Sequence, residues 1–314
     1  MKTVYFDANF FYKATNFNDR ENNTEFQKDL DKFLKKTEEH KIRIFLNPIN
    51  IIEVASHLIN SKHDRFPSYQ KVFVKMFELC KSNIFESPNK VLANKLNILR
   101  KERETADIDK LINLIISAKS YDQLVNEGQF TIRNGSVINT KYSDGSIHEY
   151  RLNKENNWIE ATENLVIKLK QNIDKSGLFK NNHEKKSELI ASFESYVYKR
   201  MFVDACYCIA SGLTSESVLG KTPDHIIDEI ISMLSAFFSA NNILIQKCMK
   251  PQGYKLEKHK NDLNDMYYLL YLCLGEDYYF VTYDSGIKTS IIGCSQESQV
   301  TTIEELLDNE EFWK

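Results

Sequence analysis

Short apolar runs alternate with amphipathic stretches at both ends of the chain. Runs rich in Val, Ile, Tyr and Phe predict buried strands at residues 2–6, 42–46, 83–86, 278–282 and 299–302. The stretches between them place apolar residues on one face of a helix. Strands that alternate with helices at this spacing favour a parallel sheet with helical crossovers, and so predict an α/β fold.

The middle of the chain follows a different pattern. Residues 101–250 have mainly helical periodicity, interrupted at 129–152 by alternating polar and apolar residues around an Asn-Gly and an Asp-Gly dipeptide. That interruption predicts a small three-stranded meander. We therefore expect one α/β core assembled from residues 1–100 and 251–314, with a mainly helical insertion between them.

Composition is that of an ordinary globular protein. The 314 residues are 42% hydrophobic and 27% charged, and only 5 Pro and 10 Gly argue against long flexible linkers. The six cysteines lack paired spacing, as expected for small buried side chains in a reducing compartment. The longest apolar run, 266–274, is too short to span a bilayer, and Asp7 interrupts the first apolar stretch. A cytoplasmic location without a membrane partner is expected.

The net charge limits how the chain could bind a polyanion. A formal charge of −3 gives no general basic surface to attract nucleic acid. If nucleic acid is the partner, local basic patches and bound metal must supply the attraction.

Five acidic residues stand where an apolar strand or helix meets a turn. Asp7 and Asp284 directly follow predicted strands, Glu53 lies early in a predicted helix, and Asp262 and Asp265 open another. The carboxyl ends of parallel strands line one edge of an open sheet, where ligands bind. Carboxylates beside apolar segments need a positive partner, and Mg²⁺ or Mn²⁺ prefers oxygen ligands. The pattern predicts a divalent-metal site.

Each acid alone also fits a structural role. Asp262 and Asp284 suit helix caps, Asp7 suits a turn with Asn9, and Glu53 suits the exposed face of a helix. Their joint occurrence favours the site. Asp265, closer to the apolar run than Asp262, is the better ligand.

In order and context these residues resemble the PIN-domain nucleases. The resemblance rests on Asp-Ala-Asn at 7–9, a Glu on the second helix, an Asp opening the penultimate helix and Thr-x-Asp at 282–284. It covers roughly residues 1–100 and 255–305. It implies a sheet of order 3-2-1-4-5 in an α/β/α sandwich and a metal-dependent ribonuclease. The insertion departs from the compact family pattern, so its role does not carry over.

By position, the resemblance assigns roles to individual side chains. Thr282 would orient an acid or the substrate phosphate. The metal-binding acids would be Asp7, Glu53, Asp265 and Asp284, with Asp262 as a fifth.

The predicted chemistry is metal-assisted hydrolysis of phosphodiester bonds, with RNA favoured over DNA. Clustered carboxylates repel one another until a cation enters, and a metal-bound water can then attack phosphorus. Asn9, Thr282, Lys258 and Lys260 are the candidate substrate contacts, although a run of lysines is also typical of a solvated face.

Two other functions remain open. A phosphohydrolase of the haloacid dehalogenase type would need a second Asp two residues after Asp7, where Asn9 stands. A non-catalytic module could instead present the insertion to a protein partner, and an inhibitory partner or a homo-oligomer is compatible with either. Convergence of the acids would favour the metal site.

Overall fold

The computed structural model gives the positions of most of the chain. It describes residues 1–17, 24–60, 65–81, 83–98, 108–127, 130–133, 136–139, 163, 167, 171, 196–211, 224–249, 254–258 and 261–314.

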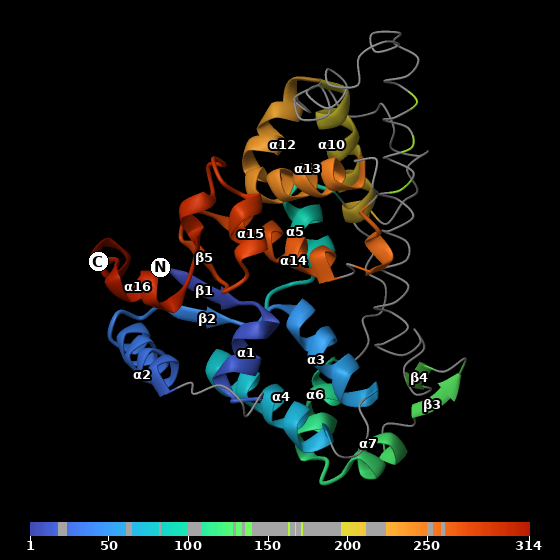
Figure 1. Cartoon of the computed structure of the whole chain (residues 1–314), viewed down its shortest axis with the longest axis vertical. Helices are drawn as coiled ribbons and strands as arrows, with labels where there is room; N and C mark the ends of the chain where they lie inside the picture. Colours follow the sequence, from blue (N-terminus) through green and yellow to red (C-terminus); the bar gives the residue numbers. More distant parts are fainter. Residues whose placement is uncertain are drawn as a thin grey trace.

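Segments from the two ends of the chain form one parallel sheet (Figure 1). Its strands are β1 (Thr3–Phe6), β2 (Arg43–Phe45), β5 (Tyr278–Val281) and β6 (Val300–Thr301), in the order β2-β1-β5-β6. All three pairings are parallel. The predicted α/β class and the joining of the two ends are confirmed, because β1 pairs directly with β5.

The predicted strand at 83–86 is present only as a single bridge. Leu46, just after β2, pairs in parallel with Ile84. The Leu46 amide donates to the Asn83 carbonyl at 2.8 Å, and the Phe85 amide donates to the Leu46 carbonyl at 3.0 Å. The segment then turns at once into a helix that begins at Pro88, so it is too short to extend the ladder. The described sheet therefore has four strands rather than the predicted five.

Residues of the central strands alternate between two cores on opposite faces of the sheet. Val4 and Phe6 belong to one core, whereas Tyr5 belongs to the other. Phe280 and Val281 of β5 divide in the same way. This period of two buries both faces, as a parallel sheet covered by helices requires.

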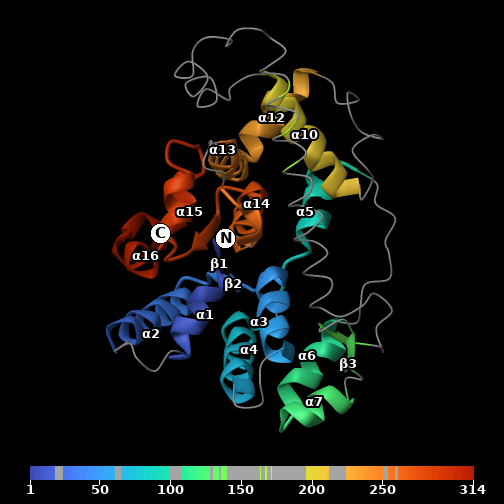
Figure 2. The same ribbon diagram turned by 45° about the vertical axis from the view of Figure 1, so that its right-hand side comes forward.

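Helices cover each face (Figure 2). The first core contains residues of helices α1 (Ala8–Ala14), α2 (Thr24–Glu39), α3 (Pro48–Asn60), α4 (Phe66–Cys80) and α16 (Ile303–Asp308). The second contains residues of α5 (Pro88–Lys95), α14 (Asn261–Leu270) and α15 (Ser285–Ser290). Capping side chains fix where several helices begin. Asp7 and Ser87 cap α1 and α5, and Thr302 forms a capping box with Glu305 at α16.

The insertion adds helices to both cores. Helix α6 (Ile108–Ser117) lies beside α4, and α7 (Tyr121–Glu127) packs against α6. Ile115 is fully buried in the first core. Helices α10 (Tyr196–Ser211), α12 (Ile227–Met233) and α13 (Ser235–Met249) add Phe202 and Phe237 to the second. The inserted helices thus share the cores of the sheet.

The remaining elements are short. Strands β3 (Phe130–Arg133) and β4 (Ser136–Asn139) form an antiparallel hairpin, so two strands of the predicted meander at 129–152 are present and the rest of it lies outside the described residues. No helix in the described ranges is both long and apolar enough to cross a membrane. The 3₁₀ helices are η2 (Asp224–Ile226), η3 (Leu256–Lys258), η4 (Tyr271–Leu274), η5 (Glu297–Gln299) and η6 (Glu310–Trp313).

Candidate functional site

Asp7 lies buried between β1 and α1, held by both of its oxygens. Its Oδ1 accepts the Phe10 amide at 2.7 Å, and its Oδ2 accepts the Thr282 hydroxyl at 2.6 Å. Only 2% of the residue is exposed. Burial raises the pKa of Asp7 to about 6, the two hydrogen bonds oppose this rise, and Asp284 adds to it. A carboxylate fixed in this way is rigid at the carboxyl edge of the sheet.

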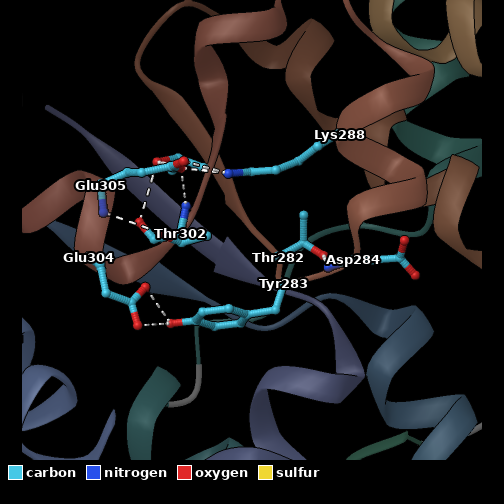
Figure 3. Close-up of polar contacts among 8 residues, drawn as sticks. Thr282, Tyr283, Asp284, Lys288, Thr302, Glu304 and Glu305 are labelled. Carbon is cyan, nitrogen blue, oxygen red and sulfur yellow. Dashed lines mark hydrogen bonds and ion pairs between the residues drawn. The ribbon is translucent and has the colours of Figure 1, made fainter. Parts of the chain in front are cut away.

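Asp284 follows β5 and caps α15. Its Oδ1 accepts the amides of Gly286 at 2.6 Å and Ile287 at 3.1 Å. Its own amide donates to the Thr282 hydroxyl at 3.0 Å, which ties it to Asp7 through one side chain. Figure 3 shows its carboxylate pointing away from Glu304 and Glu305. The helix-cap role is confirmed.

Gly286 leaves room for this cap, and sequence reasoning missed it. A Cβ added at Gly286 would lie 2.9 Å from Asp284 Oδ1, too close for two non-bonded atoms. The Thr-x-Asp-x-Gly spacing at 282–286 was the available signal. The glycine lets the backbone amide approach the carboxylate directly.

Asp265 occupies the centre of the acidic group. Its pKa is raised to about 8, first by burial and then by repulsion from Asp284, Glu53, Asp7 and Asp262. In the part of the chain that the structure describes, its carboxyl has no hydrogen-bond or ion-pair partner. The acids predicted from distant parts of the sequence therefore all act on the Asp265 carboxyl through their charge.

Asp262 and Glu53 lie at the border of this group. Asp262, one turn before Asp265 on α14, accepts a hydrogen bond from the Tyr254 hydroxyl. Glu53 lies partly exposed on α3. Its repulsive effect on Asp265 places it within electrostatic reach of the site.

A buried amide joins the three elements that carry Asp7, Glu53 and Asp265. The Asn50 side chain on α3 donates to the Phe6 carbonyl at 2.9 Å, at the end of β1. It accepts the Tyr268 hydroxyl from α14. Asn50 is fully buried. Sequence reasoning did not single it out, although a polar residue two positions after Pro48 in an apolar run was a signal.

An open pocket lies beside the acids. Its volume is about 480 Å³, open solvent included, and Asp262, Asp265 and Asp284 form its acidic side. Four residues of α13 also line the pocket, namely Ala240, Ile243, Leu244 and Lys247. Lys247 was not among the predicted substrate contacts.

The donor set fits a hard divalent cation in chemistry but not yet in arrangement. Within the described ranges, no three His, Cys, Asp or Glu side chains are grouped closely enough to hold a metal ion as they stand. Carboxylate oxygens are nevertheless the ligands that Mg²⁺ and Mn²⁺ prefer, and the unpartnered Asp265 faces the pocket with Asp262 and Asp284. Side-chain rotations would be needed to bring their oxygens onto one ion.

The predicted substrate contacts are dispersed. Asn9 and Lys258 are exposed, on the first turn of α1 and at the end of η3. Thr282 is fully buried and bonds to Asp7, so of its two predicted roles the geometry fits the orienting of an acid rather than contact with a phosphate. Lys260 lies outside the described residues.

Comparisons with protein-family models, with curated proteins and with solved structures found no match.

Proposed function

We propose that this protein is a metal-dependent endonuclease that hydrolyses phosphodiester bonds in RNA, with Mg²⁺ or Mn²⁺ as its cofactor. The observation that supports this most is the environment of Asp265. It is a largely buried carboxyl without a described partner, in a pocket, with its pKa raised to about 8 by burial and by four other acids. Such an arrangement is costly unless a cation enters it.

The strand arrangement supports a PIN-like core. The observed order β2-β1-β5-β6 corresponds to strands 2-1-4-5 of the order 3-2-1-4-5. The parallel bridge to Ile84 lies where strand 3 would be. Asp7 and Asp284 follow the two central strands, which is the position of the site in such sheets.

The acids divide into ligands and their supports. The ion would be held by Asp265, Asp284, Asp262 and Glu53. Asp7, fixed by Thr282 and the Phe10 amide, would add a further negative charge beside it. The bound cation would supply positive charge for the scissile phosphate and a more acidic water. The protein itself holds the carboxylates at one edge and, through α13, walls one side of the pocket.

A non-catalytic protein-interaction module is the second candidate, and one observation favours it. Asp7 and Asp284 cap helices and Asp262 accepts the Tyr254 hydroxyl, so three of the acids have structural roles. In that case the inserted helices would be the binding surface.

Cleavage of mixed labelled RNA and DNA, with Mn²⁺, Mg²⁺ or EDTA, tests the proposal. Wild type should cut RNA only with metal, and Asp265→Asn and Asp284→Asn should lose this activity. Asp277→Asn is the matched control, because Asp277 is an exposed acid just before β5, at the opposite end of the strand from Asp284. Absence of cutting under every condition would favour the interaction module, and release of phosphate from small monoesters would favour the haloacid dehalogenase type.

A further inference from the structure

One face of helix α13 borders the acidic pocket. Ala240, Ile243, Leu244 and Lys247 all line it, and their spacing of three and four residues places them on a single side of the helix. Helix α13 belongs to the insertion rather than to the core predicted from the ends of the chain. The insertion therefore contributes a wall, and one cationic side chain, to the candidate active site.

Lys247 is held near three acids without pairing with them. It is exposed, and it forms no ion pair with any residue that the structure describes. Its ammonium lies 5.5 Å from the centre of the Tyr254 ring, and the hydroxyl of that ring bonds to Asp262. Tyr254 thus contacts both the cation and the acid.

Other lysines close to the site are already engaged. Lys288 on α15 lies 2.6 Å from Glu305, on the side of α15 that Figure 3 shows directed away from Asp284. Lys13 on α1 lies over the rings of Phe26 and Tyr283. Lys247 also lies over an aromatic ring, that of Tyr254, but it lines the pocket itself and forms no ion pair with a described residue.

A polyanion approaching this pocket meets like charge. Three carboxylates line one side, so a nucleic-acid backbone is repelled until cations compensate. A metal ion can neutralise the scissile phosphate, but the adjacent phosphates need contacts from the protein. An exposed ammonium among the residues that line the pocket is suited to one of them.

We propose that Lys247 binds a backbone phosphate of single-stranded RNA adjacent to the scissile one, and that the α13 face forms one side of the substrate groove. This inference rests on the proposed function for the nature of its ligand. Lys247 is a positioning residue here: it fixes the strand, and the reaction occurs at the acids. Ile243, which is partly exposed on the same face, would pack against the ribose or base.

The test is binding of fluorescein-labelled single-stranded RNA, measured by anisotropy in Ca²⁺ over a series of KCl concentrations. We expect Lys247→Met to raise Kd about tenfold and to reduce the slope of log K against log salt by about 0.7, the loss of one single-strand phosphate contact. Lys247→Arg should retain binding within about threefold, because it keeps the charge.

Lys199→Met is the matched control. Lys199 lies on α10 of the same insertion and pairs with Asp228 at 2.9 Å. Its substitution should leave both Kd and salt slope unchanged. Equal Kd values for Lys247→Met and Lys199→Met, or absence of RNA binding by the wild type, would overturn the inference.

Binding and cleavage separate this inference from the proposed function. RNA binding that depends on Lys247, without metal-dependent cleavage, would support the phosphate contact and contradict the proposed nuclease function. Metal-dependent cleavage with a KM unaffected by Lys247→Met would support the nuclease function and contradict the phosphate contact. Thermal unfolding of each variant verifies that the fold is intact.

Discussion

At the scale of single residues, Asp7 and Asp265 are both acids with raised pKa values, but their surroundings differ. Asp7 accepts two hydrogen bonds, so an amide in its place would turn a donor toward the Thr282 hydroxyl. Asp265 has no such bonds among the described residues, so its replacement disturbs charge alone. Asp265→Asn is therefore the cleaner probe of the site.

We expect Asp265→Asn to abolish metal-dependent cleavage while raising the stability of the metal-free protein. The physical reason is that the folded protein must keep the Asp265 carboxyl protonated, which costs free energy at neutral pH, whereas the neutral amide carries no such cost. Calorimetry gives a second readout: Mn²⁺ should raise the melting temperature of wild type and of Asp277→Asn, but not of Asp265→Asn. Equal metal stabilisation of all three proteins would remove Asp265 from the ligand set.

The stability of the metal-free protein should fall as pH rises from about 4 to 8. The unfolded chain loses the Asp265 proton near pH 4, whereas the folded chain keeps it until about 8. In this interval the folded state binds more protons, so the free energy of unfolding decreases by about 1.4 kcal/mol per pH unit. Asp7, with its pKa raised to about 6, adds a similar slope over the lower part of the interval.

Urea unfolding at several pH values measures this slope. In Asp265→Asn the decrease should be confined to the range below about pH 6, where Asp7 titrates. Identical slopes in wild type and variant up to pH 8 would mean that Asp265 is ionised in the folded protein.

At the scale of elements, Asn50 connects β1, α3 and α14 at the point where each contributes an acid. Its amide donates to the end of β1 and accepts from α14, so the relative positions of Asp7, Glu53 and Asp265 depend on it. Thr282 has the same function between β1 and the start of α15. The site is thus positioned by buried polar side chains as well as by the sheet.

Asn50→Ala should lower the free energy of unfolding by about 2–3 kcal/mol, because it leaves the Phe6 carbonyl and the Tyr268 hydroxyl without a buried partner. It should also reduce cleavage by displacing α14. Asn94→Ala on α5, whose amide makes an exposed bond to Glu86, is the control and should change stability by less than about 0.5 kcal/mol. Chemical denaturation compares the two, and equal losses would contradict a special role for Asn50.

At the scale of the whole molecule, the inserted helices and the sheet share hydrophobic cores. Phe202 and Phe237 of the insertion lie in one core with Tyr5 and Phe280 of the two central strands. Neither the sheet nor the inserted helices could bury these side chains alone. We therefore expect the described helices α10, α12 and α13 to unfold together with the sheet.

Phe237→Ala should destabilise the whole protein by about 3–5 kcal/mol, through lost burial and the cavity left behind. In a Trp158→Phe background, far-ultraviolet circular dichroism and the fluorescence of Trp313 should still report one coincident transition, because Trp313 lies in the other core of the same sheet. Two separate transitions, with only the first shifted by the substitution, would instead show that the insertion folds independently. Phe238→Ala, a partly buried neighbour packed against the same core, should cost less.

Local sequence patterns were enough to predict most of the strands and to single out the acids as candidates. The spacing of apolar residues within short segments predicts the strands at the ends of the chain and the change of pattern at residue 101. This spacing is local, so it can be read without knowing any tertiary contact. The same local view identifies the acids, because each stands where an apolar segment meets a turn: Asp7, Glu53, Asp262, Asp265 and Asp284. The strand at 83–86 was overestimated because propensity does not reveal whether a ladder partner extends far enough.

Which side chains meet depends on the folded chain as a whole. Thr282 reaches Asp7 across 275 positions, and no local pattern encodes that hydrogen bond. The same holds for the Asn50 bridge and for the position of Lys247 on the pocket. Burial and charge repulsion depend on what surrounds a group in space, so the raised pKa of Asp265 arises only when distant segments fold together.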